Sequence, residues 1–258
     1  GHIIDSLKAK GMWENTLYVF QSDNGGPSFT GDNHTANNYP LKGAKYTNWQ
    51  GGIRVNAFVA GGYLEQVAPG MAGKKLEGFI SVADWYSTFA HIAGVDPTDP
   101  RAALANLPPI DSINMWPYLT GKIASSPRTE IFADFTVLLK GEFKLMVNQG
   151  TGHDPSSSCM KQNGTTPGAC IGFACWAGPK YPNASVPSPN CTRTEVCAGG
   201  GCLYNIFDDP FEEHDLGVDA SHAATMKDML ATLTNYQKGF FNPQRTGGDL
   251  ELAARVGH

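Results

Sequence analysis

Asp23 and Asn24 place a carboxylate beside an amide oxygen, directly after the apolar run Leu17–Phe20. This run has aromatic and β-branched members, which is typical of a strand buried on both faces in a parallel sheet. Gly25-Gly26-Pro27 ends the strand, so the polar pair is expected at its carboxyl end, where open α/β sheets bind ligands. Hard oxygen donors suit Ca²⁺ or Mg²⁺. An Asx turn is the alternative for the same residues.

All six cysteines lie within residues 159–202, a segment rich in Ser, Pro, Gly and Asn. The clustering predicts a disulfide-rich insert with three bonds, whose pairing stays open. A zinc site is the alternative, but the segment lacks a C-x₂-C pair and a histidine. Four glycosylation sequons, three of them in this segment, add to the indication of a secreted, extracellular or lysosomal/lumenal protein. The cysteines are Cys159, Cys170, Cys175, Cys191, Cys197 and Cys202, and the sequon asparagines are Asn33, Asn163, Asn183 and Asn190.

The bulk composition predicts a folded chain and excludes some partners. Of 258 residues 41% are hydrophobic and 17% are charged, which favours a buried core over disorder. The formal net charge of −5 argues against nucleic-acid binding, and no apolar run is long enough to span a bilayer. The chain opens on Gly1-His2, without methionine or a signal peptide, so a processed or partial chain is expected.

The pattern of elements changes once along the chain. Helix is expected over 1–12 and 81–94, and strands over 17–20 and 53–60. After a proline-bearing connection at 96–109, short strands over 129–135, 143–147 and 202–207 predict an antiparallel sheet, with a turn at Lys140-Gly141. A last helix is expected to end at Gly239. The division expected is therefore an α/β part, 1–122, followed by a small α+β domain, 123–258.

The helix over 81–94 carries its own start signal. Ser81 and Asp84 form a capping-box pattern. An apolar stripe at helical spacing follows and predicts core packing rather than a ligand site. Its members are Val82, Trp85, Tyr86, Phe89 and Ala93.

Several stretches, taken in order, resemble the type I sulfatases of the alkaline-phosphatase superfamily, in particular the arylsulfatase and N-acetylgalactosamine-sulfatase group. These are DNGG at 23–26, PLKGAKYTNWQGGIRVNAFVAGG at 40–62, SVADWYSTFAHIAGV at 81–95, IDSINMWPYLTGK at 110–122, FKLM at 143–146 and LYNIFDDPFEEHDLG at 203–217. The resemblance implies the back half of an alkaline-phosphatase-like α/β sandwich, followed by a small α+β domain.

The resemblance also implies roles for particular residues. Asp23 and Asn24 match the family's metal-binding pair, with Ca²⁺ the expected ion rather than Mg²⁺, and Lys45 matches the lysine that contacts the substrate sulfate. A divalent ion and a lysine would stabilise the negative charge that develops as a sulfate ester breaks. Gly51 and Gly52 are expected to allow a tight turn. Lys42 is expected to be a solvated surface lysine, and Asp32, Asn33 and His34 are loop residues that could border the substrate pocket.

The family's nucleophile is a formylglycine made in a Cys/Ser-x-Pro-x-Arg motif, which none of the six cysteines begins. Ser125-Ser126-Pro127-Arg128 lacks the residue between proline and arginine. Two interpretations follow. The chain is the carboxyl-terminal portion of a sulfatase whose nucleophile lies upstream, inactive by itself, or it is a sulfatase-like extracellular glycoprotein with a structural or glycan-contacting role. The first predicts hydrolysis of aryl or carbohydrate sulfates, with phosphodiester hydrolysis as the alternative chemistry.

Overall fold

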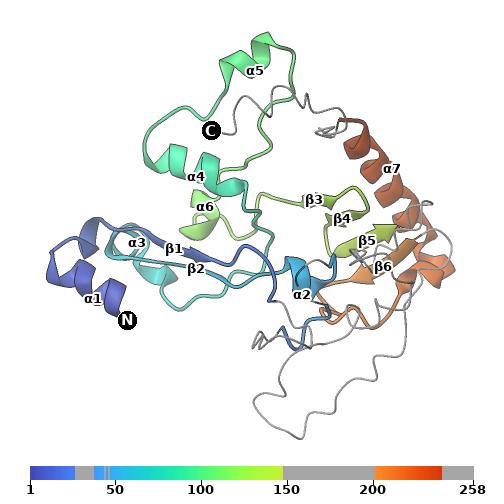
Figure 1. The fold of residues 1–258 in the computed structure, drawn as a ribbon, viewed down its shortest axis with the longest axis horizontal. Coiled ribbons are helices and arrows are strands. Elements are labelled where there is room, and N and C mark those ends of the chain that lie inside the picture. The colour runs from blue at the N-terminus through green and yellow to red at the C-terminus, as the bar shows by residue number, and fades with distance from the viewer. Residues whose placement is uncertain (27–37, 44, 46, 148–200, 240–258) are drawn as a thin grey trace, which may run out of the picture.

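The computed structural model describes residues 1–26, 38–43, 45, 47–147 and 201–239, and its elements run in the order shown in Figure 1. The part before residue 123 contains α1 (His2–Ala9), β1 (Tyr18–Gln21), α2 (Gln50–Ile53), β2 (Ala57–Ala60), α3 (Gly62–Val67), α4 (Asp84–Ile92), α5 (Pro100–Leu104) and α6 (Trp116–Leu119). The later part contains β3 (Glu130–Asp134), β4 (Val137–Lys140), β5 (Phe143–Val147), β6 (Gly201–Asn205) and α7 (Ala223–Gly239). Short 3₁₀ turns lie at 13–15, 69–71, 216–218 and 220–222.

The first sheet consists of β1 and β2, and its pairing differs from the expectation. The two strands are antiparallel, with Phe20 opposite Phe58. Because side chains alternate along a strand, Val59 faces the core while the Phe20 and Phe58 rings stack at 5.1 Å on the other face. Both rings are half exposed. The prediction of a strand buried on both faces in a parallel sheet is therefore wrong for the described part of the chain.

The strand predicted over 53–60 is only half present. Ile53 is the last residue of α2, and β2 begins at Ala57. Trp49 is fully buried and begins this short helix, which turns the chain before β2. The burial of Trp49 therefore outweighs the β propensity of Ile53 and Val55.

A small core lies beneath the first sheet, between α3 and α6. Its buried members are Leu64, Ala68, Met115, Trp116 and Leu119. Tyr63 stacks on Trp116 with ring centroids 5.9 Å apart. This core attaches β1 and β2 to the helices on one side only.

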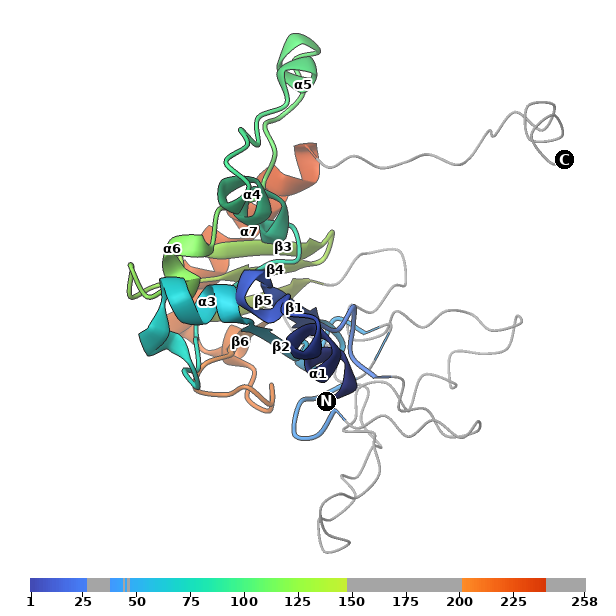
Figure 2. The same cartoon turned by 90° about the vertical axis from the view of Figure 1, so that its left-hand side faces the viewer.

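The second sheet has the order β3-β4-β5-β6 and is antiparallel throughout, as expected. The strand β4 was not predicted, and the turn at Gly141 joins β4 to β5. Both faces of this sheet are covered. Met229 and Leu233 of α7 pack with Leu138, Leu145 and Leu203 on one face, and Trp49 packs with residues such as Met146 and Tyr204 on the other. Figures 1 and 2 show α7 along the first of these faces.

Helix α4 buries its polar side rather than its aromatic stripe. Val82, Tyr86 and Phe89 are 69%, 55% and 46% exposed, whereas Asp84 and Thr88 are fully buried. Asp84 accepts hydrogen bonds from Arg128 Nε (2.7 Å) and Nη2 (2.5 Å), as well as from the N–H groups of Ser81 and Ile113. The predicted core stripe is therefore wrong, because this hydrogen-bonded network orients the helix. Trp85 alone of the aromatic residues is partly buried, and its indole donates to Gln21 (2.7 Å).

The described part of the chain thus forms an α/β fold with two antiparallel sheets. Cys202 on β6 is disulfide-bonded, while the other five cysteines lie outside the described residues. Among the described residues, no helix is both long and apolar enough to cross a membrane.

Candidate functional site

Asp23 and Asn24 directly follow β1, where the sequence predicts them. Within the described residues their side-chain hydrogen bonds are local: Asn24 N–H donates to Asp23 Oδ1 (2.9 Å), and Asn24 Nδ2 donates to Gly25 O (2.8 Å). These are the hydrogen bonds of a turn. The turn uses the amide N–H of Asn24 rather than its oxygen, and the Asp23 side chain is exposed. Both features are compatible with the turn also serving as part of a ligand site.

The loop bearing Lys45 lies against this strand end. Lys45 N–H donates to Gly26 O (3.3 Å), and Gly25 N–H donates to Gly52 O (2.8 Å). Two segments that are some 20 residues apart in sequence are thus adjacent, and the structure brings together the regions of all three predicted site residues. We call residues 38–43, 45 and 47–52 the Lys45 loop.

Asn38 was missed by the sequence reasoning, yet it holds the two segments together. Its Oδ1 accepts from Gly26 N–H (2.8 Å), and its Nδ2 donates to Gly26 O (2.8 Å) and to Gly43 O (3.2 Å). The side-chain amide therefore pairs with Gly26 as a neighbouring strand would. Its position two residues before Pro40, where the similar stretch begins, was the available signal.

The glycines of this region are needed for close approach of backbones. A Cβ at Gly25 would lie 1.7 Å from Gly51 O, and one at Gly51 would lie 2.5 Å from the carbonyl oxygens of Lys42 and Gly43. The sequence predicted a tight turn at Gly51. The structure shows a stronger requirement, which is the close approach of Gly51 to residues 41–43 of the same loop and to Gly25 at the end of β1.

A substitution at Gly51 tests this packing. We expect Gly51→Ala to lower the free energy of unfolding by about 1–3 kcal/mol, because the methyl group overlaps backbone atoms that cannot rotate away. Gly70→Ala is the matched control, since a Cβ there meets nothing within 4 Å. Urea denaturation measures both, and equal stability of the two variants would contradict the close approach.

Lys42 is buried, at 4% exposure, so its prediction as a solvated surface lysine is wrong. Its Nζ donates to Glu212 O (3.1 Å) and lies 4.0 Å from the centroid of the Trp49 ring. The hydrogen bond satisfies one donor of the ammonium, and the aromatic face adds favourable electrostatics. Lys42 thus belongs to the support of the Lys45 loop rather than to its surface.

A second buried lysine, Lys144 on β5, completes the cluster. Lys144 Nζ donates to Glu212 Oε1 and to Asn48 O (2.5 Å), while Gln50 N–H donates to Glu212 Oε2 (2.6 Å). Burial lowers the pKa of Lys144 and raises the pKa of Glu212, and in each case the partner opposes the shift. A buried ion pair is tolerated only when the two charges contact each other and their remaining polar atoms are hydrogen-bonded.

The donor chemistry of the strand end fits a hard cation, although the number of donors does not complete a site. Ca²⁺ takes six to eight oxygens, and Asp23 with Asn24 supplies two side chains. Within the part of the chain that the structure describes, no group of three or more His, Cys, Asp or Glu side chains could hold a metal ion. A complete site would need further oxygen ligands, such as carboxylates, carbonyl oxygens or water.

Several predicted residues fall outside the described part of the chain. They are Asp32, Asn33, His34, Asn163, Asn183, Asn190, Cys159, Cys170, Cys175, Cys191 and Cys197. Their roles stay predictions.

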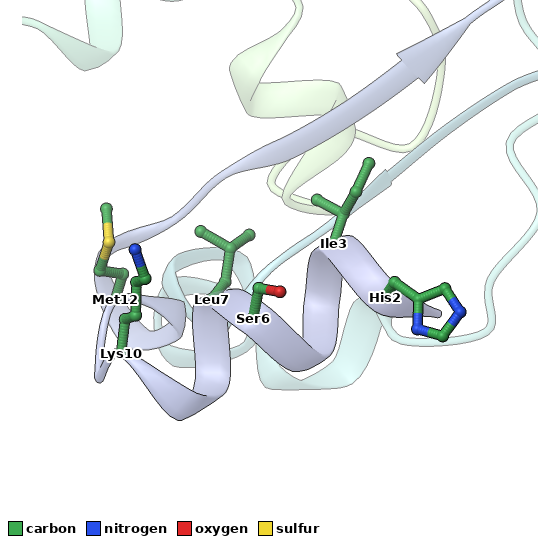
Figure 3. Close-up of a pocket in the computed structure, with 6 residues that line it drawn as sticks. All are labelled: His2, Ile3, Ser6, Leu7, Lys10 and Met12. Atoms are coloured by element: carbon green, nitrogen blue, oxygen red, sulfur yellow. The ribbon is translucent and has the colours of Figure 1, made fainter.

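A hollow of about 420 Å³ opens along α1, away from the predicted site residues. Its lining includes Ile3, Leu7 and Met12, whose side chains lie on one side of the helix in Figure 3. It has one basic side chain, Lys10, besides His2, and contains none of Asp23, Asn24 or Lys45.

Known proteins resemble this chain in sequence and in fold. Residues 1–95 match the family model described as Sulfatase. Arylsulfatase J of Mus musculus is 25% identical over 240 residues, covering 90% of this chain and 37% of the relative, and steryl-sulfatase of Rattus norvegicus is 28% identical over 250 residues with the same coverage. The solved structure of PsFucS1 sulfatase from Pseudoalteromonas sp. superposes with a TM-score of 0.58 at 21% identity, covering 94% of this chain and 41% of that one.

Residues 1–95 are therefore similar to the Sulfatase family, and the fold is similar to that of a solved sulfatase. The similarity to the two named sulfatases extends over 90% of the chain. The chain spans about 37% of the length of the curated relatives named above.

Proposed function

We propose that this chain forms part of an enzyme that hydrolyses aryl or carbohydrate sulfate esters. The observation that carries the proposal is the contact of the Lys45 loop with the end of β1, which brings Lys45 near Asp23 and Asn24. All three residues lie within the stretch that matches the sulfatase family model. The names of the relatives favour this chemistry over a non-catalytic glycoprotein.

In this proposal each residue acts through charge. The Lys45 ammonium binds the sulfate and neutralises negative charge that grows on its oxygens during cleavage. Asp23 and Asn24 hold Ca²⁺, which when bound supplies a second positive charge at the sulfate. Asn38 holds the Lys45 loop against the end of β1 through its hydrogen bonds to Gly26. The nucleophile, a formylglycine in the family, is expected upstream, because the sequence contains no Cys/Ser-x-Pro-x-Arg motif.

Exposed apolar side chains on the first sheet and on α4 support the proposal that a further part of the protein packs against these elements. Phe20 and Phe58 on the first sheet and Tyr86 and Phe89 on α4 are all at least 43% exposed. Contiguous apolar faces of this kind mark interaction surfaces.

We assign residues 1–122 to the rear of an alkaline-phosphatase-like sandwich and 123–258 to a small α+β domain with a disulfide-rich, glycosylated insert, in a secreted or lysosomal protein.

The test uses the full-length protein, expressed from its complete coding sequence. It compares the turnover of a sulfate ester with that of a phosphodiester. We expect turnover of 4-nitrophenyl sulfate to exceed that of bis(4-nitrophenyl) phosphate, and Lys45→Ala to lower kcat for the sulfate by about 100-fold or more. Lys122→Ala, an exposed lysine, is the control. Peptide mapping by mass spectrometry should reveal an upstream formylglycine peptide. Turnover unaffected by Lys45→Ala would contradict its role.

A further inference from the structure

The Lys45 loop is fixed on both sides of Lys45 by a residue from the far end of the chain. Before Lys45, Lys42 Nζ donates to the main-chain oxygen of Glu212 (3.1 Å). After it, Gln50 N–H donates to the carboxylate of Glu212 (2.6 Å). Glu212 thus holds the two sides of a loop whose middle carries the proposed sulfate ligand.

The small α+β domain supplies the rest of this attachment. Lys144 from the central strand β5 donates both to Glu212 and to Asn48 O (2.5 Å). Trp49 packs edge-on against Tyr204 of β6, with ring centroids 5.7 Å apart. Apart from the Lys144–Glu212 ion pair, which lies within the domain after residue 122, each of these contacts joins the Lys45 loop to that domain. The domain therefore helps to set the position of the loop, together with the hydrogen bonds to Gly25 and Gly26.

Glu212 has the backbone of a residue held in place by its surroundings. Its φ is +57°, in the left-handed region that a non-glycine residue seldom adopts. Such conformations persist where neighbouring contacts over-determine them, and they are frequent at functional sites. This conformation lets the carbonyl oxygen reach Lys42 while the carboxylate reaches Gln50.

Stability alone does not explain a charged pair at this place. Glu212 and Lys144 are both fully buried. An apolar pair of similar volume commonly serves stability equally well, whereas a buried charged pair can specify one arrangement among several. The arrangement specified here is that of the Lys45 loop.

We propose that Glu212 is a positioning residue for Lys45, acting through its hydrogen bond to Gln50 N–H and its contacts with the two buried lysines. The inference rests on the proposed sulfatase function and extends it to the α+β domain. That domain then takes part in sulfate recognition without contacting the sulfate.

Two double variants of the full-length protein isolate the hydrogen bond. Lys144→Met with Glu212→Gln removes both charges but keeps an oxygen for Gln50 N–H, whereas Lys144→Met with Glu212→Leu removes that oxygen too. We expect the Leu variant to lower kcat/KM for 4-nitrophenyl sulfate at least about tenfold below the Gln variant. Hydrogen–deuterium exchange should be faster in the Leu variant than in the Gln variant for peptides covering 38–52. It should be equal in the two variants for peptides covering α7, which packs on the opposite face of the sheet.

A purely structural role would give a different outcome. In that case the Leu variant would melt at a lower temperature and exchange faster throughout, without selective effect on 38–52. In a Lys45→Ala background, the change from Gln to Leu at 212 should alter turnover less than about twofold, because the positioned group is gone. A tenfold effect persisting in that background, or equal exchange of the two double variants at 38–52, overturns the inference. If wild-type protein hydrolyses no sulfate ester, the proposed function fails, while the exchange comparison still decides whether Glu212 fixes the loop.

Discussion

Replacing Asp23 by alanine in the full-length protein should abolish sulfate-ester turnover. In the proposed site the carboxylate is one ligand of Ca²⁺, and within the described residues the exposed side chain makes a local hydrogen bond to Asn24 N–H. Loss of a metal that stabilises transition-state charge by several kcal/mol lowers kcat by about 1,000-fold or more. Turnover of 4-nitrophenyl sulfate and the Ca²⁺ content by mass spectrometry are measured on the same preparation.

The control for this substitution is Asp5→Ala, which removes an exposed carboxylate from α1. It should leave both turnover and bound Ca²⁺ unchanged. Because Asp23 lies in an exposed turn, its variant should also unfold at a temperature close to that of the wild type. Near-normal turnover of Asp23→Ala with the metal still bound would rule out the assignment.

The largest expected loss of stability comes from Asp84→Ala. This substitution leaves the Arg128 guanidinium, whose side chain is 11% exposed, without its carboxylate, and it removes the acceptor for Ser81 and Ile113 N–H. In the wild type the hydrogen bonds to Asp84 raise the pKa of Arg128. Arginine is not deprotonated in proteins, so the variant keeps this positive charge after its carboxylate partner is gone. Breaking a buried ion pair in this way costs about 3–5 kcal/mol.

Urea denaturation checks this value against a surface pair. Lys140 and Asp228 lie 2.8 Å apart but are substantially exposed, so Asp228→Ala should cost no more than about 1 kcal/mol. A similar small loss in Asp84→Ala would mean that the network around α4 does not hold the helix in place.

Local patterns predicted much of the chain. The apolar run before Asp23 placed β1 to within one residue, and the local patterns placed β3, β5 and β6 of the second sheet and the end of α7, but not β4. The Asp84 carboxylate does reach back to Ser81 N–H, as the capping-box pattern predicted. These features depend on short-range chemistry that a sequence displays directly.

The errors arise where partners come from distant segments. Lys42 reads as a surface lysine because neither Glu212 nor Trp49 is recognisable as its partner from the local sequence. The aromatic residues of α4 read as a core stripe, yet Asp84 and Arg128 determine which side of the helix is buried. The family resemblance predicted roles for Lys45 and the Asp23-Asn24 pair. The residues that support the Lys45 loop were identified only from atomic contacts.

The attachment of Lys42 to Glu212 also has a consequence for biosynthesis. The two residues are separated by 170 positions, so at about 5–20 residues per second a ribosome needs on the order of 10–30 s to add the second after the first. Until then Glu212 is missing as an acceptor for Lys42 Nζ and Gln50 N–H, and contacts this far apart in the chain form late. In a nascent chain the Lys45 loop would thus reach its final arrangement only after Glu212 has been added, when local structure earlier in the chain can already have formed.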